Sequence, residues 1–164
     1  MERPIGAPVS IPASEPMMTI RDLQPADADA VVEIQAGSPE TSQWPKKDYE
    51  SVGRDGSRGW VVDEAGSVTG FLIARLIADE VEILNFAVDP RMRRRGVGKR
   101  LLSEAMAWAG RNGAARAYLE VREGNQSGVE FYRAQGFRAV GMRPNYYFNP
   151  PDDAILLAAP VSRQ

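Results

Sequence analysis

The chain has 164 residues, of which 43% are hydrophobic, and its formal net charge is −2. This length and hydrophobic content suffice for one buried core and indicate no second domain. It contains no cysteine and no histidine, which excludes disulfides, thiol nucleophiles, serine–histidine–aspartate triads and the usual zinc sites. We therefore expect no metal, and acid–base chemistry must use carboxylates, lysine or tyrosine. The slightly acidic balance predicts no stable nucleic-acid partner.

The ends of the chain differ from its middle. Residues 1–16 carry four prolines among small residues and cannot bury much apolar area, so we interpret them as a flexible leader, with Met17 or Met18 as an alternative start. Residues 17–160 are expected to form a single domain, followed by a tail over 161–164. No secretory signal or bilayer-spanning run is visible, which predicts a cytoplasmic protein without a membrane partner, as a monomer or weak dimer.

Apolar periodicity predicts alternating strands and helices in the first half of the domain. A short strand over 19–22 precedes a helix over 25–35. Residues 37–59 are polar and interrupted by prolines, which predicts a loop and a short helix. Three consecutive antiparallel strands are predicted over 60–63, 68–77 and 81–88.

The second half begins with a longer helix. It runs from Val97 to Asn112-Gly113 and is followed by a strand over 117–121. The pattern Ser127-Gly128-Val129-Glu130 is typical of a capping box, and the helix that it opens ends at Gly136. The last two strands are predicted over 137–142 and 154–158, joined by an aromatic loop that contains prolines.

Six positive charges lie within ten residues at the start of the long helix. They are Arg91, Arg93, Arg94, Arg95, Lys99 and Arg100. No acidic residue within the run balances them, and the positive end of the helix dipole disfavours each by several tenths of a kcal/mol, roughly. Gly96 and Gly98 allow main-chain N–H groups to converge on an anion, so we expect a phosphate group there.

Two alternatives to a phosphate site are a solvated basic face and a patch that contacts RNA. The strand, turn, paired glycines and helix favour the phosphate site. The segment lacks the third glycine of a dinucleotide fingerprint and the Gly-Lys-Ser/Thr of a P-loop, which argues against NAD and ATP.

The segment Arg93-Arg94-Arg95-Gly96-Val97-Gly98 resembles the R/Q-x-x-G-x-G/A signature of the GNAT superfamily of N-acetyltransferases. Residues 84–90 resemble the fourth strand of that family. The resemblance implies an α/β (α+β) fold with a mixed, mostly antiparallel central sheet, splayed at an acetyl-CoA site, and helices on both faces. It also implies a set of residues that bind the cosubstrate acetyl-CoA: the backbones of Phe86, Ala87 and Val88 for the pantetheine arm, and Arg93, Arg94, Arg95, Gly96, Val97, Gly98 and Lys99 around the diphosphate.

Residues 119–125 and 131–137 resemble one branch more closely, the bacterial ribosomal-protein-alanine N-acetyltransferases, and the similarity continues to Ile155. The branch implies that Glu120 is the general base, that Tyr132 is the general acid and that Asn125 contacts the cofactor. The alternatives are an exposed strand carboxylate, a core tyrosine and an asparagine that only caps a helix.

The implied chemistry is direct acetyl transfer to the α-amine of a protein N-terminus, in that branch a ribosomal protein. The pKa of an α-amine is about 8, so the amine must lose a proton, which Glu120 would take, while Tyr132 would protonate the departing thiolate. The oxyanion of the tetrahedral intermediate would meet the Val88 N–H. Because the chain has no cysteine, an acyl-cysteine route is excluded.

Aromatic residues are expected at the acceptor site. Trp44 matches the tryptophan of a Pro-Trp-Ser/Thr element of the branch, although its neighbours here are Gln43 and Pro45. Tyr146 and Tyr147 are expected to wall the acceptor channel. The alternatives are a lysine or small-molecule acceptor, a noncatalytic acyl-CoA sensor and an RNA-contacting accessory protein.

Overall fold

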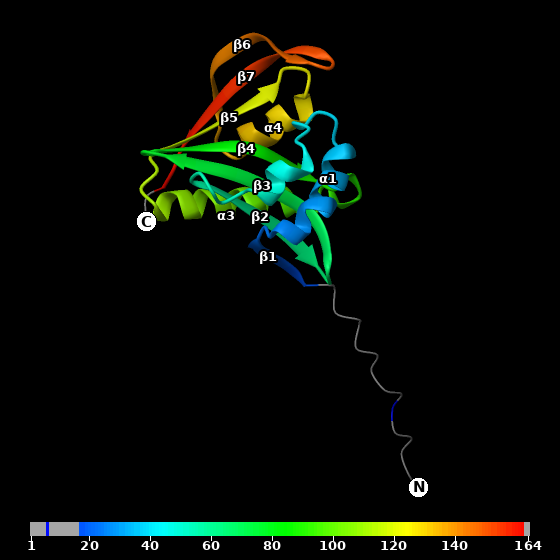
Figure 1. Cartoon of the computed structure of the whole chain (residues 1–164). Helices are drawn as coiled ribbons and strands as arrows, with labels where there is room; N and C mark the ends of the chain where they lie inside the picture. The colour runs from blue at the N-terminus through cyan, green and yellow to red at the C-terminus, as the bar shows by residue number, and fades with distance from the viewer. Residues whose placement is uncertain (1–5, 7–16, 163–164) are drawn as a thin grey trace.

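The central feature of the fold is a seven-stranded sheet with the strand order β1-β2-β3-β4-β5-β7-β6. The computed structural model describes residue 6 and residues 17–162, so the predicted leader lies, apart from Gly6, outside the described residues. Figure 1 shows β1 at one side of the sheet and β6 and β7 at the other. The β4–β5 pair is parallel and the other neighbouring pairs are antiparallel, which confirms the mixed, mostly antiparallel sheet.

Strands and helices alternate along the chain. The strands are β1 (Met18–Asp22), β2 (Ser57–Glu64), β3 (Ser67–Ile77), β4 (Glu80–Val88), β5 (Arg116–Arg122), β6 (Arg138–Phe148) and β7 (Pro151–Pro160). The α-helices are α1 (Ala28–Ala36), α2 (Lys46–Glu50), α3 (Val97–Arg111) and α4 (Gln126–Ala134), and two short 3-10 helices are η1 (Pro25–Asp27) and η2 (Pro90–Met92). Among the described residues, no helix is both long and apolar enough to cross a bilayer.

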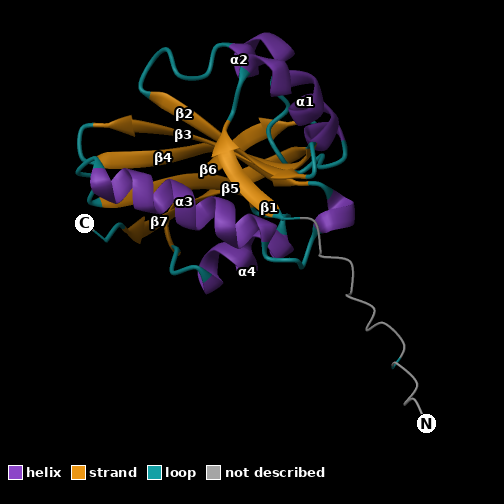
Figure 2. Cartoon of the chain, turned by 90° about the horizontal axis from the view of Figure 1, so that it is seen from below, coloured by secondary structure: helices purple, strands orange, loops and turns teal. Residues whose placement is uncertain are grey.

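Helices cover both faces of the sheet, as predicted (Figure 2). The apolar stripe of α3, which includes Leu101 and Ala105, packs with Val129 of α4 in the larger core. On the opposite face, Val31 of α1 and Tyr49 of α2 form a second core with Phe71 of β3. The helical spacing of apolar residues in α3 therefore reflects one-sided packing against the sheet.

Two predicted boundaries are wrong. The predicted aromatic loop before residue 154 is largely strand: β6 runs to Phe148, and Tyr147 pairs with Asp152 across the hairpin to β7. The prediction interpreted the prolines as loop residues. They are instead tolerated within the hairpin, where the β6–β7 register is irregular between Arg143 and Tyr147 and at a strand end. The predicted helix over 25–35 is divided into η1 and α1.

An irregularity in β4 prepares the site. Ile73 of β3 pairs with Asn85, but the next residue, Ala74, pairs with Ile83, so Leu84 is an extra, bulged residue. Pairing between β4 and β5 begins at Glu80 and ends where Ile83 meets Leu119. Beyond that point, residues 84–88 of β4 and 120–122 of β5 separate. We call this opening the β4–β5 gap, and it confirms the predicted splay of the sheet.

Candidate active site

The β4–β5 gap contains a cavity of about 60 Å³. Its walls come from β4, β5, α4, β6 and the loop between α1 and α2. The lining residues are Glu40, Thr41, Ser42, Ile83, Leu84, Asn85, Phe86, Leu119, Glu120, Val121, Asn125, Tyr132 and Tyr147. The fold thus brings together Phe86, Glu120, Asn125, Tyr132 and Tyr147, five of the residues predicted for the site.

Glu120 is a partly buried carboxylate on β5. Its side chain is 19% exposed, and its Oε1 lies 2.9 Å from Arg143 Nε on β6. A hydrogen bond to Glu120 raises the pKa of Tyr146. Two polar partners therefore hold this carboxylate at the gap, which argues against the alternative of a solvated strand residue.

Tyr132 lies on α4 within an aromatic cluster. Its ring centroid is 5.3 Å from that of Phe131, 5.8 Å from that of Phe137 and 6.1 Å from that of Phe86 on β4. Burial raises the pKa of Tyr132 well above its usual value. The phenol therefore keeps its proton at neutral pH, as a general acid must.

Tyr146 and Tyr147 lie on β6 rather than in a loop. Their rings meet edge to face at 5.0 Å, and the Arg122 guanidinium lies 4.2 Å from the Tyr147 ring centroid. Burial, with a smaller effect of Glu120, raises the pKa of Tyr147 to about 12. Tyr147 contributes to the cavity wall, whereas Tyr146 is 45% exposed beside Glu120.

The main chain of β4 presents an unpaired edge to the gap. The Asp89 N–H donates to the Thr69 carbonyl at 2.8 Å, which directs Asp89 and Ala87 toward β3. Because successive residues of an antiparallel ladder point in opposite directions, the N–H groups of Phe86 and Val88 point away from β3. The Phe86 N–H is taken by Asn85 Oδ1 at 3.1 Å, so Val88 presents the N–H that faces the gap.

Acidic residues far away in the sequence pair with the arginine loop, residues 91–96. Arg93 Nη2 lies 3.0 Å from Glu40 Oε1, and Arg95 Nη2 lies 3.0 Å from Glu64 Oε1. No acidic residue lies within the run, as the sequence shows, but tertiary contacts bring these two carboxylates to it.

Arg91 also has an acidic partner, Asp89, at 2.9 Å. Arg94 and Lys99 are exposed and have no ion pair within the described part of the chain. Unlike Arg91, Arg93 and Arg95, these two side chains are not held by a carboxylate and are available to an anion at the start of α3.

The two glycines at the start of α3 serve different purposes. Gly96 precedes α3 with φ +79°, a left-handed conformation that favours glycine, and a Cβ there would meet open space. A Cβ on Gly98 would lie 3.2 Å from Phe86 Cζ, so Gly98 allows α3 to approach β4 closely. The start of α3, whose first N–H groups lack helical partners, therefore adjoins the open edge of β4.

Asn125 caps α4. Its Oδ1 accepts from the Gly128 N–H at 3.0 Å, so the cap is Asn125 and not the predicted Ser127. A Cβ on Gly128 would lie 2.5 Å from Asn125 Nδ2, which explains the glycine at that position. Because Asn125 also lines the cavity, capping and ligand contact are compatible.

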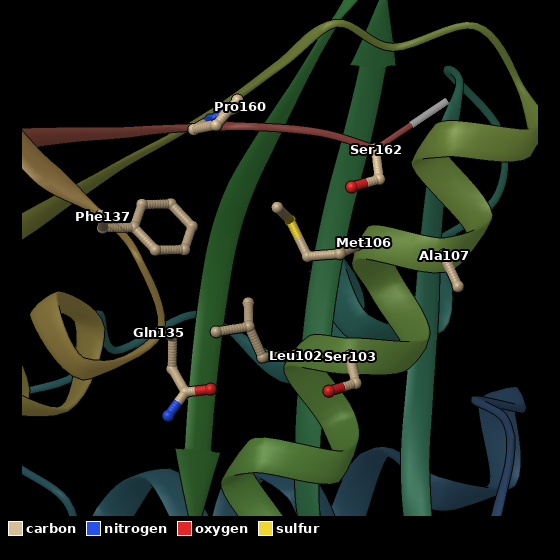
Figure 3. A pocket seen from close by; sticks show the side chains of 8 residues that line it. All are labelled: Leu102, Ser103, Met106, Ala107, Gln135, Phe137, Pro160 and Ser162. Atoms are coloured by element: carbon tan, nitrogen blue, oxygen red, sulfur yellow. The ribbon is translucent and has the colours of Figure 1, made fainter. Parts of the chain in front are cut away.

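Trp44 is not part of the gap cavity. Its ring stacks on Tyr49 at 5.3 Å, and it lines a separate hollow of about 370 Å³ with α2 and β2 residues such as Asp48 and Ser57. Another hollow, of about 320 Å³, lies beside α3, where the Phe137 ring faces Leu102 and Met106 (Figure 3). Neither hollow contains the carboxylate, tyrosine and open strand edge that meet at the β4–β5 gap.

The sequence interpretation missed four polar residues that line the gap, Glu40, Thr41, Ser42 and Asn85. Asn85 is 4% exposed, and its Nδ2 donates to the Tyr49 hydroxyl at 2.8 Å and to the Ser42 carbonyl at 3.0 Å. Its signal was a polar residue inside the otherwise apolar run 83–88. Glu40 lies in a polar loop, where nothing in the sequence distinguishes it from a solvated acid.

Comparisons with known proteins agree with this geometry. The family model described as acetyltransferase (GNAT) family matches residues 20–137. A ribosomal protein bS18-alanine N-acetyltransferase of Escherichia coli is 30% identical over 89% of this chain and 99% of its own length. The crystal structure of the ribosomal-protein-alanine N-acetyltransferase from Escherichia coli superposes with a TM-score of 0.79 at 30% identity, covering 90% of this chain and 96% of that one.

A crystal structure of Ard1 from Thermoplasma volcanium gives the same TM-score of 0.79 at 32% identity, over 88% of this chain and 97% of that one. Three features therefore agree: the splayed sheet, the glycine-containing start of α3 and the extended sequence similarity. The chain belongs to the GNAT family of acetyltransferases and is an N-acetyltransferase.

Proposed function

We propose that this enzyme transfers the acetyl group of acetyl-CoA to the α-amine of a protein N-terminus, with a ribosomal protein as the acceptor. The observation that carries the proposal is the β4–β5 gap, where the open edge of β4 leads from the start of α3 to Glu120 and Tyr132. The names of the bacterial relatives, including a putative bS18-alanine enzyme of Bacillus subtilis that is 29% identical, support this acceptor.

The residues at the start of α3 fit the diphosphate of coenzyme A. Arg94 and Lys99 supply free positive charge, and the first N–H groups of the helix supply donors. From there the pantetheine arm would follow β4. Because the ladder turns Ala87 toward β3, we assign the main-chain contacts to Phe86 and Val88. The Val88 N–H would donate to the carbonyl oxygen as negative charge develops on it.

Glu120 and Tyr132 divide the proton transfers. Glu120, held by Arg143, would accept the proton that the α-amine must lose before it attacks, directly or through one water. Tyr132, which burial keeps protonated, would donate to the sulfur as the carbon–sulfur bond breaks. The acetyl group passes from sulfur to nitrogen, and the protonated amine gives up two protons. The first would pass through Glu120 to solvent, and the second would leave the tetrahedral intermediate and restore the Tyr132 phenol that protonated the sulfur.

Peptide acetylation tests the proposal directly. The enzyme is incubated with acetyl-CoA and a library of peptides that differ at the first residue, each with an internal lysine, and the modified nitrogen is identified by tandem mass spectrometry. Acetylation of α-amines, with a preference for alanine or serine at the first position, is the expected result. Acetylation confined to lysine side chains would replace this acceptor with the lysine alternative.

A further inference from the structure

The loop between α1 and α2 is a compact unit. We call residues 37–45 the acceptor loop. The Gln43 Nε2 donates to the carbonyls of Gln35, Ser38 and Thr41 at 3.0–3.3 Å, and the Thr41 N–H donates to the Ser38 carbonyl at 2.9 Å. Since these bonds tie the loop to itself, a displacement at one residue is transmitted to the others.

The acceptor loop forms one wall of the β4–β5 gap. Glu40, Thr41 and Ser42 line its cavity. The Thr41 hydroxyl donates to the Phe86 carbonyl at 3.5 Å, and Asn85 Nδ2 holds the Ser42 carbonyl at 3.0 Å. The loop therefore lies against the strand that we assign to the pantetheine arm.

Arg93 joins the acceptor loop to the arginine loop. Its Nη2 donates to Ser38 Oγ at 3.1 Å and to Glu40 Oε1 at 3.0 Å. Ser38 is fully buried, and the Glu40 side chain is 31% exposed. One nitrogen of Arg93 thus has both of its hydrogens directed at the wall of the acceptor site.

A guanidinium carries five N–H donors in a fixed plane. The Nη2 of Arg93 uses two of them, and its Nε and Nη1 have no hydrogen-bond partner in residues 6 and 17–162. Three donors therefore remain for an anion at the start of α3, without loss of the contacts to Ser38 and Glu40. Arg93 therefore has enough donors to hold the acceptor loop and a phosphate at the same time.

We propose that Arg93 and Glu40 are positioning residues that couple the two substrates, so that coenzyme A fixes Arg93 and Arg93, through Glu40, orders the acceptor loop for the incoming peptide. This inference rests on the proposed function, because it assumes coenzyme A at α3 and a peptide in the gap. Since coupling between sites is reciprocal, the peptide must strengthen coenzyme binding by the same factor.

Calorimetry measures this coupling without turnover. An alanine-terminated peptide is titrated into the wild-type enzyme with and without saturating coenzyme A, and the ratio of the two Kd values gives the coupling factor. We expect a factor on the order of 5–150 in the wild type, the usual range for coupled sites. We expect a factor of about 1 in Arg93→Ala, in Glu40→Ala and in the double variant, because either change breaks the same link.

Two matched variants separate positioning from folding. Glu40→Gln keeps an oxygen that accepts from Arg93 and should retain part of the coupling, whereas Glu33→Ala, an exposed position on α1, should retain all of it. A folded Glu40→Ala variant with the wild-type factor, or a wild-type factor of 1, would overturn the inference alone. A wild-type enzyme that binds coenzyme A but no α-amine peptide would overturn the proposed function as well.

Discussion

At the scale of single residues, the account depends on Glu120 and Tyr132. Glu120 forms an ion pair with the Arg143 guanidinium, and Tyr132 lies among aromatic rings, where burial raises the pKa of its phenol. The sequence did not show that Arg143 contacts Glu120 or that Phe86 contacts Tyr132, because each partner lies on another element, β6 and β4 respectively.

Substitution of Glu120 tests the base. Glu120→Gln should lower kcat about 10²- to 10⁴-fold near pH 7, because the protonated amine loses its acceptor. The rate of the variant should recover partly above pH 8 or so, where the free α-amine predominates in solution. A pH profile identical to that of the wild type would remove Glu120 from this role. Glu123→Gln, an exposed neighbour, is the matched control.

Substitution of Tyr132 tests the acid. Tyr132→Phe should lower kcat about 100-fold, the lower end for a lost proton donor, while the Kd of coenzyme A stays within a few-fold because the ring contacts remain. Because burial raises the pKa of Tyr132, its phenol stays neutral up to and somewhat above pH 10 or so. Ionisation of Tyr132 should therefore cause no fall in the kcat of the wild type below about pH 10. An unchanged kcat in the variant would contradict the assignment.

At the scale of elements, single side chains determine where helices begin. The cap of α4 depends on Asn125 and on the space beside Gly128, and the start of η1, which leads into α1, depends on Asp27, which accepts from the Gln24 N–H at 2.7 Å. Asp27 is 8% exposed and forms an ion pair with Arg21 of β1 at 2.8 Å. The Asp27–Arg21 pair joins η1 to β1, and the Asn125 cap fixes the start of α4 beside the gap.

The cap of α4 can be measured by thermal unfolding. Asn125→Ala removes the oxygen that accepts from Gly128 and should cost about 1 kcal/mol. For a chain of this length, that corresponds to a Tm lower by about 2–4 °C. Asn125→Asp retains the acceptor and should melt close to the wild type. Equal Tm values for the alanine and wild-type proteins would show that α4 needs no cap here.

The Asp27–Arg21 pair predicts a pH dependence of stability. The hydrogen bond from Arg21 lowers the pKa of Asp27 in the folded protein, so the pair stabilises the fold above the ordinary carboxyl pKa of about 4. This stabilisation is lost as the pH falls through the lowered pKa. Asp27→Asn should therefore be less stable than the wild type in urea unfolding at pH 7, by a margin that shrinks toward pH 3.

The control for this pH dependence is Asp22→Asn. Asp22 pairs with Arg58 at 2.8 Å, but its side chain is 53% exposed, so solvent screens the pair. Its stability difference from the wild type should be small at both pH values. A margin for Asp27→Asn that stays constant with pH would contradict the assigned role.

At the scale of the whole molecule, local patterns predicted the element order and long-range contacts determined the site. The one-sided stripe of α3 and the alternation in β5 were readable because each reflects burial of one face. The ion pairs of Arg93 and Arg95 join residues more than 30 positions apart, so no local pattern encodes them. The bulge at Leu84 was missed for the same reason, since it exists only relative to β3.

The most direct test of the central claim is an amide NMR titration with acetyl-CoA. The account places the cosubstrate along the open edge of β4 and at the start of α3. The amide signals of Val88, Gly96 and Val97 should therefore shift in a saturable way with one common Kd, while that of Ala87, whose N–H is directed at β3, should shift less. Saturable binding that leaves Val88 and Gly96 unperturbed would contradict the account.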